Sequence, residues 1–290
     1  MGFLDTPYHI EREDADLYVE QVGPEDAPVI YYLHGGPGYN SFSFRDLVGE
    51  DLEAYRMIYA DQRGAGRSYA DVGFGLDELT EDVLTVLDAL AVPRATLLAH
   101  GFGALVAART AVRHPDRIDR MLFVNPWFSM PLLARAMQRE AAVASGQTDI
   151  ALPPEEALAD PETIDAEGTV DQAFELVAAK QLFDRMQFPD PSVRLRLEHS
   201  DSETLFGPQA SAMPTSPWRM EVLADLTVIR AATVVMAGRD DRTSYPEQAE
   251  AGLERMEHAL FSLLPAGHYP WIDAPDDFLS VLTEAMTSMS

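Results

Sequence analysis

A short apolar run, a tight turn of small residues and a helical pattern follow one another directly at positions 96–108 of this 290-residue chain. A strand that leads without a spacer into a helix is a unit of sheets that helices cover on both faces. Small residues at positions 99, 101 and 103 leave room for the sharp change of direction. The segment therefore predicts an α/β architecture. Its sequence is Thr96-Leu97-Leu98-Ala99-His100-Gly101-Phe102-Gly103-Ala104-Leu105-Val106-Ala107-Ala108.

Other apolar runs along the chain support the same architecture. Short β-rich runs without polar alternation are typical of strands covered on both faces, and helical patterns with 3.6-residue apolar spacing separate them. We therefore expect a mostly parallel, doubly wound sheet with an edge hairpin at its start, and a functional site beyond the carboxyl ends of the strands. The predicted hairpin strands are 9–13 and 17–22, the core strands are 29–33, 56–60, 96–99, 121–124, 233–237 and 260–264, and the helices are 79–90, 105–114, 249–257 and 278–286.

One long segment breaks the alternation of strands and helices. Residues 127–218 contain helical stretches but no run typical of a core strand. We predict that this segment is a mostly helical lid inserted between two strands, and that residues 1–126 and 219–290 form the core domain. Proline-rich joints, which interrupt helices, lie at 152–154, 188–191 and 213–217.

Composition argues against several classes of function. The chain has 48 acidic and 21 basic residues and a formal net charge of −27 at pH 7, and such a field repels the phosphates of a nucleic acid. It has no cysteine, and its histidines lack the spacing of a metal site. No apolar run predicts a membrane span, and the start lacks the pattern of a secretory signal. We expect a protein of the cytoplasm without a cofactor, and the sequence leaves the oligomeric state open.

The turn at positions 99–103 has the layout of a nucleophile elbow, G-x-S-x-G, in which a serine stands on a strained strand-to-helix turn. Ala99 and Gly103 take the two small positions, and Gly101 takes the position of the serine. A glycine has no side-chain oxygen that could attack a substrate. The sequence thus predicts the turn without the usual nucleophile at its tip.

A glycine-rich loop follows the strand 29–33 directly. Its sequence, His34-Gly35-Gly36-Pro37-Gly38, stands where such loops contribute a backbone N–H to an oxyanion hole. We expect the donors to be Gly35 and Gly36, together with the N–H of Phe102, which follows the elbow position.

An acid and a base follow the elbow in the order that this kind of site uses. Asp240 and Asp241 come after the strand 233–237, and His268 comes after the last predicted strand. We predict that His268 is the catalytic base and that Asp241 is its partner. Asp241 is preferred over Asp240 because it lies one residue further from the strand.

Taken together, these motifs resemble the proline iminopeptidase branch of the α/β-hydrolases. The specific pair is His34-Gly35-Gly36-Pro37-Gly38 and Asp61-Gln62-Arg63-Gly64-Ala65-Gly66-Arg67-Ser68, and Gly238-Arg239-Asp240-Asp241 and Gly267-His268 match the acid and base motifs. The resemblance covers about residues 25–125 and 225–290. It implies an α/β-hydrolase fold and hydrolysis of an N-terminal proline residue, or of a related small amide or ester, through an acyl-enzyme and without a cofactor. The implied partner is a small-molecule or short-peptide substrate.

The chain departs from that family at two points. Gly101 replaces the nucleophile, and neither lid tryptophan, Trp127 or Trp218, is followed by the glutamate that the resemblance implies. Three interpretations stand: a hydrolase that has naturally lost its serine and has weak or altered chemistry, a protein that binds a small ligand without turnover, and a peptidase whose serine was replaced deliberately. The codon for residue 101 in the source gene distinguishes the first from the third.

A water molecule can stand in for the missing side chain. A triad site that has lost one member still accelerates hydrolysis roughly 10³–10⁴-fold over water, and His268 can act as general base on a water beside Gly101. This predicts slow, single-step hydrolysis with no acyl-enzyme. Ser41, Ser43 and Ser68 are alternative nucleophiles, but nothing in the sequence places them near His268.

Overall fold

A single sheet forms the centre of the computed structural model, which describes residues 2–70, 73–147, 164–202, 217–244, 249 and 252–288. Its strands are β1 (Phe3–Glu11), β2 (Ala15–Pro24), β3 (Val29–Leu33), β4 (Arg56–Ala60), β5 (Tyr69–Ala70), β6 (Ala95–His100), β7 (Ile118–Val124), β8 (Ala232–Gly238) and β9 (Ala259–Leu264). The order is β1-β2-β4-β3-β6-β7-β8-β9, and β5 pairs with β2. The β1–β2, β2–β4 and β2–β5 pairings are antiparallel, and every pairing from β4 to β9 is parallel. The predicted mostly parallel sheet is therefore confirmed.

The two strands at the middle of the sheet begin and end where the sequence predicts them. β3 and β4 match the runs 29–33 and 56–60, because a strand buried on both faces is itself the apolar run. β6, β7, β8 and β9 all extend beyond their predicted runs, and β7 begins at Ile118 rather than at residue 121. The hairpin begins earlier and is longer than predicted, and its register runs from Phe3 opposite Pro24 to Glu11 opposite Asp16. The predicted strand 9–13 is wrong at its end, because residues 12 and 13 belong to the turn between β1 and β2. The two residues of β5 carry no pattern that could have predicted a strand.

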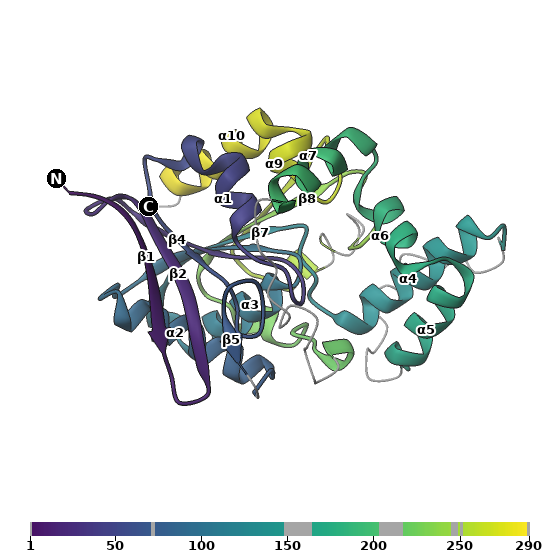
Figure 1. Cartoon of the computed structure of the whole chain (residues 1–290), viewed down its shortest axis with the longest axis horizontal. Coiled ribbons are helices and arrows are strands. Elements are labelled where there is room, and N and C mark those ends of the chain that lie inside the picture. Colours follow the sequence, from purple (N-terminus) through teal and green to yellow (C-terminus); the bar gives the residue numbers. More distant parts are fainter. Residues whose placement is uncertain are drawn as a thin grey trace.

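Helices cover both faces of the sheet (Figure 1). The core cluster on one face includes residues of α2 (Leu76–Ala89) and α3 (Gly103–Arg113). The cluster on the other face includes residues of α1 (Phe42–Val48), α9 (Pro270–Asp273) and α10 (Pro275–Ser288). Short 3₁₀ turns are η1 (Gly49–Leu52), η2 (Pro115–Arg117), η6 (Pro217–Arg219) and η7 (Asp225–Val228).

Three of the four predicted core helices are present, and the predicted end of the fourth helix is wrong. α2, α3 and α10 correspond to 79–90, 105–114 and 278–286, and each begins two or three residues before its predicted start. The predicted helix 249–257 does not reach its expected end, because residues 254 and 255 form a turn; part of this stretch lies outside the described residues. α1 and α9 were not predicted, since one or two turns show little periodicity.

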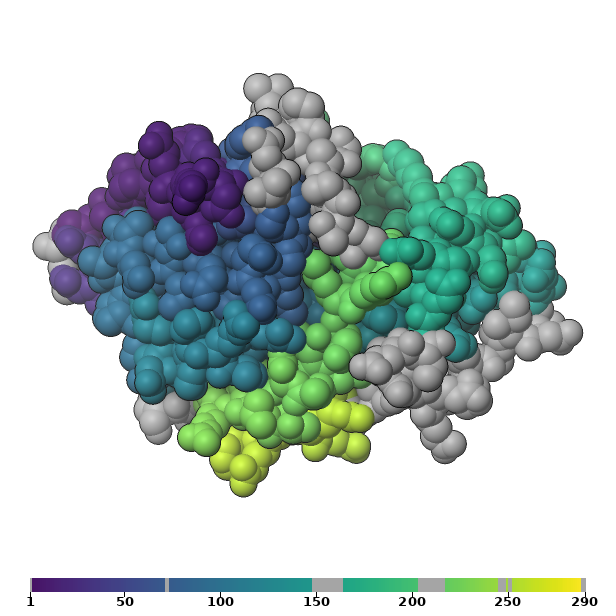
Figure 2. All heavy atoms as spheres, turned by 90° about the horizontal axis from the view of Figure 1, so that it is seen from below, coloured from purple at the N-terminus to yellow at the C-terminus, as the bar shows by residue number. Residues whose placement is uncertain are grey.

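The segment predicted as a lid lies between β7 and β8 in the chain. Its described helices are α4 (Met130–Ala144), α5 (Ala166–Leu176), α6 (Ala179–Gln187) and α7 (Pro191–Ser202). Figure 1 shows α4, α5 and α6 beside the sheet, and Figure 2 shows this region (teal and green) at the opposite end of the molecule from the N-terminal hairpin (purple). The predicted joint at 152–154 and residues 213–216 of the predicted joint at 213–217 lie outside the described residues, and Pro217 begins η6.

The chain enters and leaves the predicted lid through two segments that run side by side. Val222 N–H donates to Phe128 O (2.9 Å), and Met130 N–H donates to Met220 O (2.9 Å). This pairing lies close to the predicted domain boundaries at 127 and 218, and these boundaries and the lid stay a prediction.

Candidate active site

Gly101 stands at the turn between β6 and α3 with a φ of +49°. This left-handed conformation costs a residue with a side chain about 1–2 kcal/mol, whereas glycine adopts it freely. Gly101 N–H donates to Val124 O (3.1 Å), and Gly101 O accepts from the N–H groups of Ala104 (3.1 Å) and Trp127 (3.0 Å). The turn is therefore held both by α3 and by the end of β7.

The open side of Gly101 faces His268. A β-carbon built on Gly101 would lie 3.4 Å from His268 Nε2 and 3.7 Å from Trp127 Cε2, both ordinary van der Waals distances. A serine side chain would therefore fit this space with its oxygen near the imidazole. The structure thus brings together two residues that lie 167 positions apart in the chain.

His268 is paired with Asp241. His268 Nδ1 lies 3.1 Å from Asp241 Oδ2 and 3.1 Å from Thr243 Oγ1. Because Thr243 Oγ1 donates its own proton to Asp241 Oδ1 (2.7 Å), it accepts from the imidazole. This network assigns the proton to Nδ1 and leaves the lone pair of Nε2 directed toward Gly101. Asp241 and His268 are buried, whereas Asp240 is exposed.

Four hydrogen bonds hold the carboxylate of Asp241. Besides His268, its donors are Thr243 N–H (2.9 Å), Thr243 Oγ1 (2.7 Å) and Ser244 Oγ (3.1 Å). Donors of this number stabilise an ionised carboxylate and fix its orientation. Asp241 can therefore stabilise a positive charge on His268 without moving.

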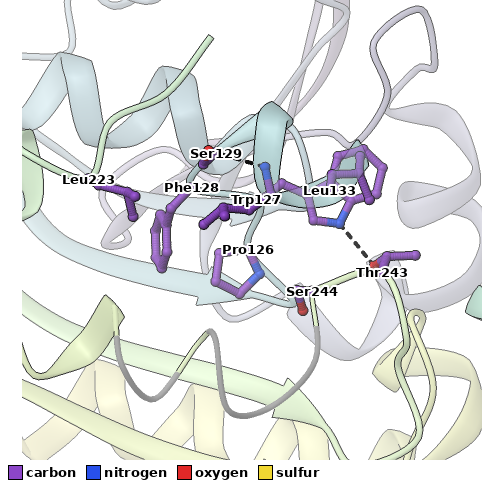
Figure 3. A pocket seen from close by; sticks show the side chains of 9 residues that line it. Pro126, Trp127, Phe128, Ser129, Leu133, Leu223, Thr243 and Ser244 are labelled. Atoms are coloured by element: carbon purple, nitrogen blue, oxygen red, sulfur yellow. Dashed lines mark hydrogen bonds between the residues drawn. The ribbon is translucent and has the colours of Figure 1, made fainter. Parts of the chain in front are cut away.

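Trp127 supports both members of this pair. Its indole N–H donates to Thr243 Oγ1 (2.9 Å), as the dashed line in Figure 3 shows. Its ring stacks on the imidazole of His268, with centroids 5.4 Å apart and planes 19° apart. The sequence predicts Trp127 only as the first residue of the lid, although an aromatic residue shortly after the carboxyl end of β7 could have indicated a place in the site.

The loop at 34–38 is fixed by the side chain of its first residue. His34 Nδ1 donates to Gly35 O (2.6 Å), and His34 Nε2 accepts from Gln62 N–H (2.9 Å). Burial lowers the pKa of His34, in keeping with a neutral ring that donates once and accepts once. Gly36 has a φ of +137°, a conformation open almost only to glycine. Hydrogen bonds to His34 and the conformation of Gly36 therefore define the backbone path of the loop.

A cavity of about 270 Å³ brings several of the predicted residues together. Gly35, Gly36 and His268 line it, whereas Gly101, Phe102 and Asp241 do not. Phe102 precedes the first residue of α3, where backbone N–H groups have no partner within the helix. Apolar side chains form much of the remaining wall, as in most sites for small molecules; they include Trp127, Met130, Leu133, Phe183 and Trp218.

A family model described as the alpha/beta hydrolase fold matches residues 28–275. The chain belongs to this family. A proline iminopeptidase-related protein from Thermus thermophilus is similar to it in structure, with 35% identity, a TM-score of 0.84 and 98% of each chain covered.

Curated relatives match only a part of the chain. The protein named "Putative carbamate hydrolase RutD" from Variovorax paradoxus is 38% identical over 114 residues, which is 38% of this chain and 42% of that protein. Epoxide hydrolase 1 from Caenorhabditis elegans is 31% identical over 121 residues, which is 40% of this chain and 30% of that protein. The chain thus spans less than half the length of these curated relatives.

In this α/β-hydrolase, the second glycine-rich motif anchors the segment that follows the first. Asp61 is fully buried. Its Oδ1 accepts hydrogen bonds from the N–H and the hydroxyl of Ser41 (both 2.8 Å). Its Oδ2 accepts hydrogen bonds from the backbone N–H (2.8 Å) and the Nε–H (2.7 Å) of Arg67. Ser68 Oγ donates to Asp61 O (2.7 Å), and Ser43 Oγ lies 2.8 Å from Tyr39 Oη. The serines weighed as alternative nucleophiles therefore have structural partners of their own.

His100, which directly precedes the elbow position, also belongs to the site. Its Nε2 donates to His268 O (2.9 Å), its ring centroid lies 4.4 Å from that of His268, and it lines the cavity. Burial holds the pKa of His100 well below its usual value. It therefore places no second positive charge beside His268. The sequence feature that could have indicated this role is a polar ring directly before the elbow position.

The described part of the chain contains no group of three or more histidine and acidic side chains placed to hold a metal ion. Within the same residues, no helix combines the length and apolarity needed to cross a membrane.

Proposed function

We propose that this α/β-hydrolase cleaves a small amide or ester with a water molecule, in place of a serine, as the nucleophile. The observation that carries the proposal is the distance of 3.4 Å between a β-carbon built on Gly101 and His268 Nε2. The elbow is kept, the side chain is missing, and room for an oxygen atom remains beside the base. A water there needs at least two polar partners, and His268 Nε2 can supply one of them.

In the proposed reaction, His268 Nε2 takes a proton from this water as its oxygen attacks the substrate carbonyl. The N–H groups of Gly35, Gly36 and Phe102 stabilise the negative charge that forms on the carbonyl oxygen. His268 then returns the proton to the leaving nitrogen or oxygen as the tetrahedral intermediate collapses. Asp241 stays ionised and stabilises the imidazolium throughout.

The proposed substrate is a small molecule or short peptide with an apolar group next to the carbonyl. A volume of about 270 Å³ and the apolar wall favour such a ligand. Similarity to the proline iminopeptidase-related protein makes an N-terminal proline amide the first choice to test. Met130, Leu133, Phe183 and Trp218 line the cavity from the segment that we propose as the lid.

The test compares turnover of a proline arylamide and a short-chain aryl ester by the protein as it stands and by its Gly101→Ser and His268→Ala variants. We expect slow turnover that His268→Ala abolishes, with no acyl-enzyme visible by mass spectrometry. Gly101→Ser should hydrolyse the same substrates faster and should form an acyl-enzyme. Asp240→Asn, a change at an exposed neighbour of Asp241, is the matched control and should behave like the unchanged protein.

A covalent intermediate on the unchanged protein, or turnover that survives His268→Ala, would overturn the water mechanism. Turnover by Gly101→Ser alone would instead favour a protein that binds its ligand without reaction. The cavity supports this second candidate, since it is kept although the elbow has no nucleophile. Calorimetric titration with a proline amide would then give binding without product.

A further inference from the structure

The base of this site has an open face because Gly101 has no side chain. His268 Nδ1 is occupied by Asp241 Oδ2 and Thr243 Oγ1, each at 3.1 Å. His268 Nε2 points at the space above Gly101, where a β-carbon would lie at 3.4 Å. A serine there would donate its hydroxyl to Nε2 and cover the lone pair. With glycine, the lone pair is available to a proton of the substrate itself.

The ring of His268 is held from several sides. Trp127 stacks on one face, and Tyr269 meets the ring edge to face at 5.2 Å and 89°. The carbonyl of His268 accepts from Asn125 Nδ2 (3.0 Å) and His100 Nε2 (2.9 Å). A base with a fixed direction is suited to taking a proton from carbon, because such a transfer needs an aligned C–H bond.

The charged groups around this base suit a cation at His268. Asp241 is buried beside it and accepts four hydrogen bonds. Burial keeps the pKa of His100, the titratable ring beside it, well below its usual value. The same cavity is lined by Gly35 and Gly36, whose backbone N–H groups would stabilise a negative oxygen. The arrangement combines a base with an oxyanion site and lacks the nucleophile that normally stands between them.

We propose that this site also removes a proton from the carbon next to the carbonyl of a small ketone or thioester and so forms an enolate. The inference rests on the roles of His268 and Asp241 in the proposed function, but it needs no hydrolysable bond. His268 Nε2 takes the proton, the C–H electron pair becomes the carbon–carbon double bond, and the carbonyl π pair moves to oxygen. The N–H groups of Gly35, Gly36 and Phe102 stabilise that oxygen. In the reverse step the imidazolium returns a proton to the carbon.

Deuterium exchange tests this step. Phenylacetone, a small apolar ketone with no hydrolysable bond, is incubated with the protein in D₂O, and loss of its α-proton signals is followed by NMR. We expect exchange well above the buffer rate, a return to the buffer rate in His268→Gln, and at least a tenfold decrease in Gly101→Ser. Asp241→Asn gives a second variant of the same pair, and Asp240→Asn is the control that should exchange like the unchanged protein. Circular dichroism confirms that each variant is folded.

Exchange at the buffer rate, or exchange that His268→Gln or Gly101→Ser leaves unchanged, would overturn the inference. Ester hydrolysis without ketone exchange would overturn it while the proposed function stands. Ketone exchange without ester hydrolysis would support it while the water mechanism fails.

Discussion

The hydroxyl of Tyr39 donates a 2.6 Å hydrogen bond to Asp201 Oδ1 and so joins the loop that follows Gly38 to helix α7. Tyr39 lines the cavity, and Asp201 is the last residue but one of α7. This contact links the glycine-rich loop to the predicted lid. Its strength depends on pH, because burial raises the pKa of Asp201 to about 6.

Asp201→Asn should change how stability depends on pH. The carboxyl of Asp201 has a pKa near 3.9 in the unfolded chain and a pKa of about 6 in the folded protein. It therefore stabilises the folded protein fully below about pH 4, and this stabilisation is lost as the pH rises through about 6. The asparagine variant lacks this loss. Relative to the unchanged protein, its melting temperature should therefore rise between pH 4 and pH 7. Thermal unfolding at several pH values measures this, and the exposed Asp171, changed to Asn, should show no such trend.

Arg63→Met should destabilise the core strongly. The fully buried guanidinium of Arg63 donates to both oxygens of Asp82 (2.6 and 2.7 Å) and to Asp14 Oδ2 (2.8 Å). Removing it leaves the buried carboxylate of Asp82 with Arg12, at 3.0 Å, as its remaining charge partner, so the loss should lie near the lower end of the range of about 3–5 kcal/mol for a broken buried ion pair. Urea unfolding measures the loss, and Asp82→Leu combined with Arg63→Met should recover part of it. A loss no larger than that of Arg239→Met, an exposed arginine, would contradict the argument.

Alanine at Gly103 should be worse than alanine at Gly101. A β-carbon on Gly103 would lie 2.3 Å from Leu33 O, so α3 or β3 must move, whereas the nearest atom to a β-carbon on Gly101 is at 3.4 Å. Gly101→Ala carries only the left-handed backbone cost of about 1–2 kcal/mol. Gly103→Ala should lose more than this and should also weaken ligand binding, because β3 leads directly into the loop at 34–38. Denaturant unfolding of the two variants measures their free energies of unfolding, and equal losses in the two variants would contradict this prediction.

Thr243→Val should reduce both proposed activities more than tenfold, because one hydrogen bond contributes about 0.5–1.5 kcal/mol and the change removes more than one. The change removes the donor to Asp241 Oδ1 and the acceptor for Trp127 Nε1. Thr243→Ser keeps the hydroxyl and should restore activity. The pH profile of the rate is the deciding measurement, since a purely structural role would lower the rate at every pH without moving the profile.

The sequence alone determined the sheet and the order of its motifs. β3 and β4 could be placed residue by residue, because a strand buried between helix layers must be apolar throughout. The turn at Gly101 and the loop at 34–38 were readable because only small residues permit such backbone paths. These are local constraints, and each leaves its mark within a few neighbouring residues.

The tertiary structure decided how distant side chains meet. Neither the stacking of Trp127 on His268 nor the bond between Tyr39 and Asp201 leaves a local pattern, because the partners lie 141 and 162 positions apart. The same holds for the link from His100 to the carbonyl of His268. The contacts of His268 with Trp127 and His100 arise because the parallel strands bring their carboxyl ends to one edge of the sheet, and the bond between Tyr39 and Asp201 arises because α7 packs beside that edge. These contacts depend on how the side chains are placed in space, and they leave no local sequence pattern. The motifs in the sequence therefore indicated most residues of the candidate site, but they did not indicate the neighbouring side chains that position those residues.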